Sequence, residues 1–255
     1  MEDFDMIRMI LHGCSGHMGK VVTDIVSARE DIMITAGVDR VQADRPYPIY
    51  ESLSACEKEA DVIVDFSGAG AVDALLEQAV EKKLPIVLCT TGLSEEQLAA
   101  VKEASAKIPI LRSANMSLGV NALYKIVSLA TQILGESGFD IEIVEKHHNR
   151  KADAPSGTAI AIADVINETL GGGHDYNMGR GPQSGKRQPG EIGIQAVRGG
   201  TIVGEHEVLF CGLDEVIEIR HTAYSRAIFG KGAVEAAVFL AGKEPGMYQM
   251  KDVIG

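Results

Sequence analysis

A short segment in the second half of the chain carries the side chains best suited to acid–base chemistry. It runs from Glu145 to Thr158 and contains two groups able to donate a proton near neutral pH: His147, and Lys151 if the lysine is partly desolvated. The neighbouring pair His147 and His148 could also suggest a metal. Adjacent positions rarely converge on one ion, however, and no carboxylate–histidine spacing supports such a site, so we expect no metal.

The end of the same segment predicts an anion site at the start of a helix. Pro155 bars helix before it and Ser156 is a favourable N-cap, so the backbone N–H groups that follow lack helical acceptors. Those donors, the helix dipole and the Thr158 hydroxyl suit one carboxylate, and His148 with Lys151 could hold a second. The alternative is a basic surface loop before a well-capped helix. The expected substrate-binding residues are His148, Ser156, Gly157 and Thr158.

A second cluster, near the N-terminus, has the pattern of a dinucleotide-binding turn. Gly13, Gly16 and Gly19 stand between an expected strand and an expected helix, where glycines let backbone N–H groups approach a pyrophosphate. Asp39 ends the next strand, 20 residues after Gly19, where an acid meets the adenosine ribose hydroxyls. The adjacent Arg40 can accept the 2′-phosphate of NADP, so NADH and NADPH both stay open. The alternative is an ordinary glycine-rich turn.

Two further segments follow expected strands, at the edge of a parallel sheet where ligands bind. The short side chains of residues 89–91 could line a nicotinamide pocket, and Asn115 could bond the carboxamide or cap the next helix. The expected cofactor-binding residues are Gly13, Cys14, Ser15, Gly16, His17, Met18, Asp39, Arg40, Cys89, Thr90, Thr91, Ser113, Ala114, Asn115 and Met116.

The helices and strands that must position these residues follow a different pattern after about residue 117. Before it, apolar periodicity predicts alternating strands and helices, at 6–11, 17–28, 61–66, 70–82, 85–88, 94–106 and 108–112. After it, we expect helices at 118–134 and 157–170, a loop at 174–190, and strands at 139–146, 191–198, 204–210 and 215–221. Repeated strand–helix units imply a parallel sheet, whereas strands in sequence imply α+β.

We therefore predict an α/β protein of two domains. Residues 1–116 form a Rossmann-like, parallel-sheet, dinucleotide-binding domain, to which 227–255 return through a last helix at 227–240. Residues 117–226 form a smaller α+β domain with a mixed sheet, for substrate binding and oligomerisation.

Composition narrows the function classes. The chain has 255 residues, of which 45% are hydrophobic, as in globular proteins, and no apolar run is long enough to span a membrane. The net charge of −12 disfavours nucleic acid and anionic membranes as partners. The N-terminus does not have the basic start of a secretory signal, and the four scattered cysteines suit a reducing compartment, so we expect a cytoplasmic protein.

The segment EKHHNRKADAPSGTA closely resembles the signature of the 4-hydroxy-tetrahydrodipicolinate reductase family, also called dihydrodipicolinate reductases. The resemblance covers essentially the whole chain, through the stretches GCSGHMG, VDFS, TTG, SANMSLGVN, IGIQAVRGGTIVGEHEVLF and AIFGKGAVEAAVFLAGKEPGMYQMKDV. Three departures stand out: Asp39 stands where some members have a glutamate, Cys89 replaces a common glycine, and the proline usual after Ser67 is missing.

The resemblance implies an NAD(P)H-dependent oxidoreductase that converts a cyclic dicarboxylate, hydrated or dehydrated, to tetrahydrodipicolinate on the diaminopimelate route to lysine. It implies that His147 is the acid/base residue, that Lys151 is a second proton donor, and that the protein is a homotetramer. Two alternatives remain. Another two-domain NAD(P)-dependent dehydrogenase of a small amino or keto acid would not need HHNRK followed by PSGT, and a non-catalytic dinucleotide sensor should have lost His147 or Lys151.

Overall fold

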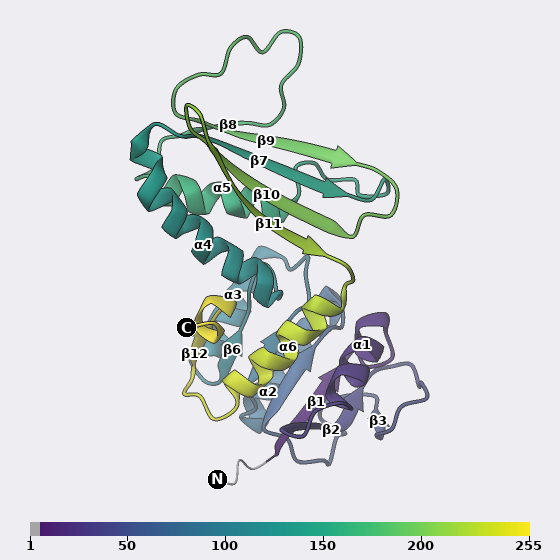
Figure 1. Cartoon of the computed structure of the whole chain (residues 1–255). Helices are drawn as coiled ribbons and strands as arrows, with labels where there is room; N and C mark the ends of the chain where they lie inside the picture. The colour runs from purple at the N-terminus through teal and green to yellow at the C-terminus, as the bar shows by residue number, and fades with distance from the viewer. Residues whose placement is uncertain (1–5) are drawn as a thin grey trace. The chain divides into compact units, whose positions relative to one another are not determined.

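The computed structural model describes residues 6–255 and divides into two compact units (Figure 1). The first contains the chain up to Leu118 together with Ala227–Gly255, and the second contains Gly119–Arg226. Within the described residues, no helix combines the length and apolar character that crossing a membrane requires.

The first unit is built on a seven-stranded parallel sheet in the order β12-β6-β5-β4-β1-β2-β3, which confirms the Rossmann-like prediction. The central strands are apolar almost throughout because helices cover both faces of the sheet. The strands are β1 (Ile7–His12), β2 (Ile32–Val38), β3 (Ile49–Tyr50), β4 (Val62–Asp65), β5 (Ile86–Leu88), β6 (Pro109–Leu111) and β12 (Gly246–Tyr248).

A separate core fills each face of this sheet. On one face, α1 (His17–Val26) and α6 (Ala227–Leu240) pack over Met9, Leu11 and Val64. On the other, α2 (Val72–Lys82), which the short helix η1 (Ala69–Ala71) precedes, and α3 (Glu95–Ser105) pack over Ile10 and Ile63. The short α7 (Met250–Val253) closes the chain. Alternate residues of β1 therefore serve opposite cores, as a doubly covered strand requires.

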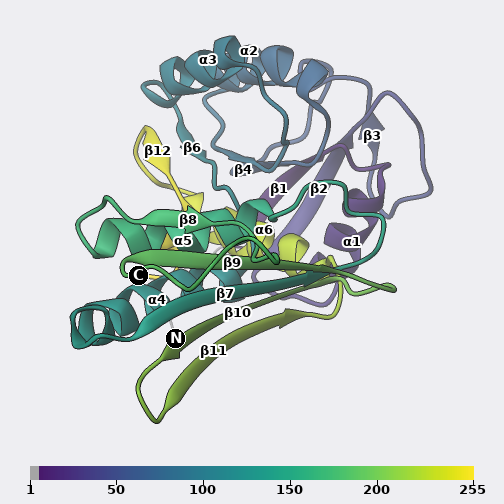
Figure 2. The same cartoon turned by 90° about the horizontal axis from the view of Figure 1, so that it is seen from above.

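The second unit is a five-stranded mixed sheet in the order β11-β10-β7-β9-β8, as predicted (Figure 2). The strands are β7 (Asp140–His147), β8 (Asp175–Asn177), β9 (Glu191–Arg198), β10 (Gly204–Cys211) and β11 (Val216–Ala223). β7 pairs parallel with β9 and antiparallel with β10. The helices α4 (Leu118–Leu134), which η2 (Gly135–Ser137) follows, and α5 (Gly157–Thr169) bury their apolar sides against the sheet in one core.

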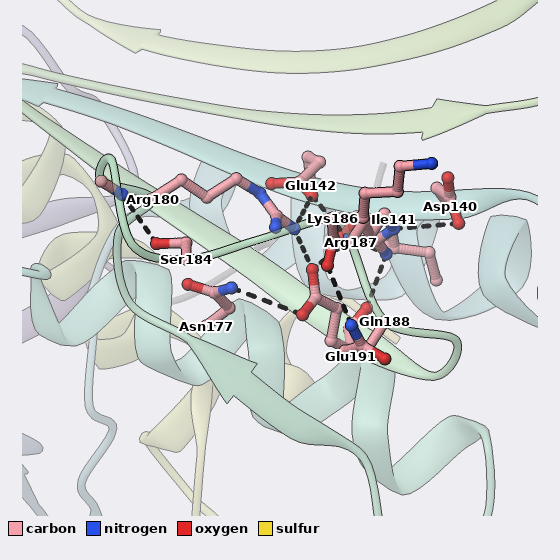
Figure 3. Close-up of polar contacts among 11 residues, drawn as sticks. Asp140, Ile141, Glu142, Asn177, Arg180, Ser184, Lys186, Arg187, Gln188 and Glu191 are labelled. Atoms are coloured by element: carbon pink, nitrogen blue, oxygen red, sulfur yellow. Dashed lines mark hydrogen bonds and ion pairs between the residues drawn. The ribbon is translucent and has the colours of Figure 1, made fainter.

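The segment expected to be a loop at 174–190 is more ordered than its composition suggested. Residues 175–177 form the edge strand β8, and two arginines tie the remainder to the sheet (Figure 3). Arg187 Nη1 lies 2.6 Å from Glu142 Oε1, and Arg180 pairs with both Glu142 and Glu191. Gly193 faces Glu142 across the β7–β9 pair, and a Cβ there would lie 1.8 Å from Glu142 Oε2, so the glycine makes room for this carboxylate.

Candidate active site

The site in the second unit is organised by a buried carboxylate on the central strand. Glu145 and His147 are two residues apart on β7, so their side chains leave the same face of the sheet. Glu145 is fully buried, and its Oε2 lies 2.6 Å from His147 Nδ1. The Ser156 backbone N–H donates to Glu145 Oε1 over 2.9 Å, which ties the start of α5 to the same carboxylate. The histidine at the end of the strand is therefore fixed in place.

Arg198 supplies the positive charge that this burial requires. It is the residue of β9 in register with His147, and its guanidinium binds Glu145 through both nitrogens, Nη1 to Oε2 at 2.7 Å and Nη2 to Oε1 at 2.6 Å. Burial acts to raise the pKa of Glu145, but the hydrogen bonds from Arg198, His147 and Ser156 outweigh it and hold the pKa below its ordinary value. An ionised carboxylate only accepts, so His147 donates from Nδ1 and its Nε2 remains for chemistry.

A second histidine lies on the other side of β7. His206 on β10 is in register with Glu145, and its ring meets that of His147 edge-on, with centroids 5.2 Å apart. Burial, with the charge of His147 adding to it, lowers the pKa of His206 to about 4, so His206 is neutral near pH 7. Its Nε2 lies 2.9 Å from Ser156 Oγ, which also accepts from the Ala159 N–H.

Ser156 is the N-cap of α5, as its sequence position predicted. We expected it among the substrate-binding residues, but its side chain is 2% exposed, and its hydroxyl both caps α5 and contacts His206. The hydroxyl is thus already committed to the fold. Gly157, the first residue of α5, has open space where a Cβ would stand, so its backbone is accessible at the positive end of the helix.

Positive charge gathers beside this helix start. The pKa of His148 is lowered, first by burial and then by the charges of Arg150, Arg226, His147 and Lys151. The His148 Nδ1 is buried without a hydrogen-bond partner, although buried polar atoms normally have one. Lys151 Nζ lies 2.8 Å from Asp153 Oδ2, and 21% of the lysine side chain is exposed. The start of α5 is therefore surrounded by cations and is suited to bind an anionic group.

The Thr158 side chain lies in the first turn of α5. Burial raises the pKa of Tyr124, on α4, to about 12, and the Thr158 hydroxyl partly offsets this rise. Tyr124 is therefore a neutral phenol near pH 7.

The first unit contains a cleft of about 650 Å³ at the carboxyl edge of its sheet. Gly13 and Gly16 line it from the turn after β1, and Asp39 and Arg40 line it from the end of β2. Gly13 has φ +79°, and a Cβ there would lie 2.6 Å from the Phe66 backbone, so only glycine fits. The segment without the usual proline, Ser67 to Gly70, forms part of the wall through Ser67, Gly68 and Gly70.

This cleft fits the adenosine side of a dinucleotide. Asp39 Oδ2 accepts from the Ser15 N–H at 3.0 Å and Oδ1 accepts from the Val41 N–H at 3.1 Å, which fixes the carboxylate where ribose hydroxyls would bind. The start of α1, at Gly16, has no side-chain cap, so its N–H groups remain for a phosphate.

The remaining expected cofactor residues are spread over several places. His17 and Met18 begin α1, whereas the Cys14 side chain is buried in the core against Gly37. Residues 89–91 follow β5, with Thr90 donating to Asp65 over 2.6 Å, and residues 113–116 follow β6. Asn115 Oδ1 accepts from the Ser117 N–H over 2.9 Å, in the turn just before α4. None of residues 89–91 or 113–116 lines the cleft itself.

Comparison with known proteins decides between the alternatives. Residues 7–116 match the family model described as "Dihydrodipicolinate reductase, N-terminus", and residues 119–254 match the model for its C-terminus. The chain belongs to the dihydrodipicolinate reductase family. It is an NAD(P)H-dependent oxidoreductase, as predicted.

Relatives and solved structures agree with this assignment. The chain is 53% identical to the 4-hydroxy-tetrahydrodipicolinate reductase of Caldanaerobacter subterraneus subsp. tengcongensis and 47% identical to that of Clostridium novyi, in each case over 98% of both chains. Its fold is similar to that of a dipicolinate-bound dihydrodipicolinate reductase from Paenisporosarcina sp. TG-14, with a TM-score of 0.81, 24% identity, and coverage of 97% of this chain and 99% of that one. A diaminopimelate dehydrogenase of C. glutamicum shares only the fold, with a TM-score of 0.58 and 11% identity over 98% of this chain and 95% of that one.

Three residues of this reductase's site escaped prediction from sequence: Glu145, Arg198 and His206. The first could have been found, because two residues of separation on a strand place Glu145 beside His147. Arg198 and His206 come close to Glu145 only because β7 pairs with β9 and β10, and no local sequence pattern predicts this pairing. Among the described residues, no group of three or more His, Cys, Asp or Glu side chains is placed to hold a metal ion.

Proposed function

We propose that this protein reduces 4-hydroxy-tetrahydrodipicolinate, or the ring formed from it by loss of water, to tetrahydrodipicolinate with NADH or NADPH. This is a step of the diaminopimelate route to lysine. The observation that carries the proposal is the buried Arg198–Glu145–His147 array at the end of β7, in a chain of this family.

The substrate's two carboxylates have complementary partners in the second unit. One binds at the start of α5, where the Gly157 backbone and Thr158 offer donors and the helix dipole is positive. The other pairs with the Lys151 ammonium and accepts a hydrogen bond from His148, beside the cations that lower the pKa of His148. In this assignment Lys151 exchanges Asp153 for the substrate.

Side chains at and just after the end of β7 supply the proton. The nicotinamide, when bound, supplies the hydride. His147 donates a proton from Nε2 to the reduced ring, and Lys151 assists as a second donor. Glu145 keeps the His147 ring oriented and stabilises its protonated form, while Arg198 balances the charge of Glu145. Neutral His206 shields one side of the ring without competing for the proton.

Assembly and location complete the proposal. The face of the five-stranded sheet that is not covered by α4 and α5 carries the exposed apolar side chains Val197 on β9 and Val216 on β11, and Leu213 is exposed in the turn before β11. We assign this face to the contact between copies in a homotetramer. The four cysteines are free, which fits the cytoplasm. Light scattering should give about four times the 27.2 kDa of one chain, and a monomer at micromolar concentration would refute the tetramer.

The test of the activity is oxidation of the reduced nicotinamide on addition of the condensation product of pyruvate and aspartate semialdehyde. We expect oxidation with both cofactors, and none when either precursor of the product is omitted. A folded protein that binds NADH but never oxidises it with this substrate would contradict the proposed reaction.

A further inference from the structure

A histidine that the acid–base site does not use lies beside the dinucleotide cleft. His12 is the last residue of β1, directly before the turn at Gly13, and it lines the cleft with Gly13, Gly16 and Asp39. Its side chain is 14% exposed. An apolar side chain would be expected at this position, because β1 is a buried strand of a parallel sheet.

A buried carboxylate fixes the ring of His12. Asp65, the last residue of β4, is in register with His12, fully buried, and places its Oδ1 2.7 Å from His12 Nδ1. Thr90, after β5, donates to Asp65 Oδ2 over 2.6 Å, and the Ser67 N–H donates to Oδ1 over 3.1 Å. Burial acts to raise the pKa of Asp65, but the hydrogen bond and charge of His12 outweigh it and lower the pKa. Asp65 is therefore ionised, and His12 donates to it from Nδ1.

The other ring nitrogen is directed to a ligand. His12 Nε2 hydrogen-bonds to no described residue, in a side chain that is mostly buried and lines the cleft. We propose that His12 binds the pyrophosphate bridge of the dinucleotide through Nε2. A phosphate oxygen requires a donor, so His12 binds as the cation, and the ionised Asp65 is the partner that stabilises this form. The inference rests on the proposed use of NAD(P)H and adds a residue to its binding site.

Other charged groups face the same space and must be separated from His12. Asp39 and Arg40 after β2, and Glu51 after β3, also line the cleft, and all three are unchanged when only His12 is replaced. Burial raises the pKa of Cys89, near Asp65, well above its ordinary value, so this thiol is neutral.

The test compares His12→Asn with the wild type by calorimetric or fluorescence titration. Asparagine can still donate to Asp65 but has no group at the Nε2 position. We expect Kd for NADH to rise about tenfold, the loss of one charge-assisted hydrogen bond, and the same rise for ADP-ribose, which lacks the nicotinamide.

The control is Lys20→Ala, which removes an exposed cation of α1 that is paired with Asp24. Its Kd for NADH should stay within about twofold of the wild type. An unchanged Kd in His12→Asn, whatever its melting temperature, would show a purely structural role and overturn the inference. A rise for NADH but not for ADP-ribose would place His12 at the nicotinamide and also overturn it. A wild type that binds neither ligand would refute the proposed function itself.

Discussion

The carboxylate of Glu145 and the imidazole of His147 leave β7 on the same side and meet at 2.6 Å. Because β7 is the middle strand of its sheet, partners for this pair arrive from both neighbours, Arg198 from β9 and His206 from β10. Strand pairing thus sets the orientation of the proposed proton donor before any ligand binds. Such preorganisation lowers the entropy cost of positioning a reacting group.

Removal of either proposed proton donor should lower turnover with the fold intact. We expect His147→Ala and Lys151→Ala each to reduce kcat by ~10²–10⁴-fold, because a donor acting in the transition state is lost. Lys151→Ala should also raise KM, since Lys151 is proposed to hold a carboxylate. Steady-state kinetics with circular dichroism as the folding check would measure both, and a near-normal kcat in either variant would remove that residue from the mechanism.

Neutralising Glu145 should affect both stability and the pH profile. In Glu145→Gln, Arg198 loses its counter-ion, and we expect a loss of ~3 kcal/mol at pH 7, the lower end for a buried pair because Arg198 is partly exposed. The pKa of Glu145 is lowered in the folded state, so its contribution is complete above the unfolded value of ~4.3 and is lost as pH falls through the folded value. The wild type should therefore destabilise more steeply in acid than the variant.

The kinetic consequence separates orientation from stability. Without the Glu145 charge, protonated His147 is less favourable, so kcat should fall in Glu145→Gln and should no longer follow the protonation of Glu145 as the pH is lowered. Glu142→Gln is the matched control, because Glu142 lies on the opposite face of β7 and pairs with Arg180 and Arg187. It should leave the pH–rate profile unchanged. An identical profile in Glu145→Gln would mean that Glu145 does not act on His147 during turnover.

Replacing Thr158 with Val should act mainly on substrate binding. A hydroxyl that donates to a carboxylate is worth ~1.5–3 kcal/mol, so KM should rise by about tenfold or more. The dinucleotide cleft lies in the other unit, and Kd for NADH should stay nearly unchanged. Equal damage to NADH binding in a titration would place Thr158 in the wrong role.

Arg180 and Arg187 hold the 178–190 segment to the sheet through Glu142, so weakening these contacts should make the segment more sensitive to protease. In Gly193→Ala the new Cβ would displace the Glu142 carboxylate, which lies 1.8 Å from that position, and loosen its bonds to Arg180 and Arg187. Trypsin should then cleave after Lys186 and Arg187 faster than in the wild type. Gly181→Ala, in the same segment but with open space around its Cβ, is the control. Equal cleavage rates in the two variants would mean that the contacts of Glu142 with the two arginines do not protect the segment.

Most of the fold was predictable because its signals are local. Helical periodicity and apolar runs located the main strands and helices, and the turn glycines located the cleft. The short edge strands β3, β8 and β12 escaped, since two or three residues carry no periodic pattern. The same limit hid Arg198 and Asp65, whose roles arise only when register places them beside His147 and His12. The hydroxyl of Ser156 caps α5, as its sequence position predicted, and its substrate-binding role stays a prediction because a good cap and a ligand donor look alike in sequence.

The last prediction concerns the choice between NADH and NADPH, which we expect the pair Asp39–Arg40 to control. Both residues line the cleft, and Asp39 is held by the N–H groups of Ser15 and Val41. A 2′-phosphate carries about −1.5 to −2 charges, so it is repelled by Asp39 and attracted by Arg40 to a comparable degree. The two effects nearly cancel, and we expect kcat/KM values for the two cofactors to lie within ~100-fold of each other. Because Arg40 is exposed, added salt should shrink whatever preference exists.

Arg40→Ala removes one side of this balance. It should lower kcat/KM for NADPH by ~10-fold or more, the cost of a charge-assisted hydrogen bond, and leave NADH nearly unaffected. Arg45→Ala is the informative control, because Arg45 donates from Nε to the Cys14 carbonyl over 3.0 Å and so supports the glycine turn itself. Its loss should weaken both cofactors alike. Steady-state kinetics on the two variants decides the assignment: equal losses for NADH and NADPH in Arg40→Ala would mean that Arg40 does not face the 2′ position.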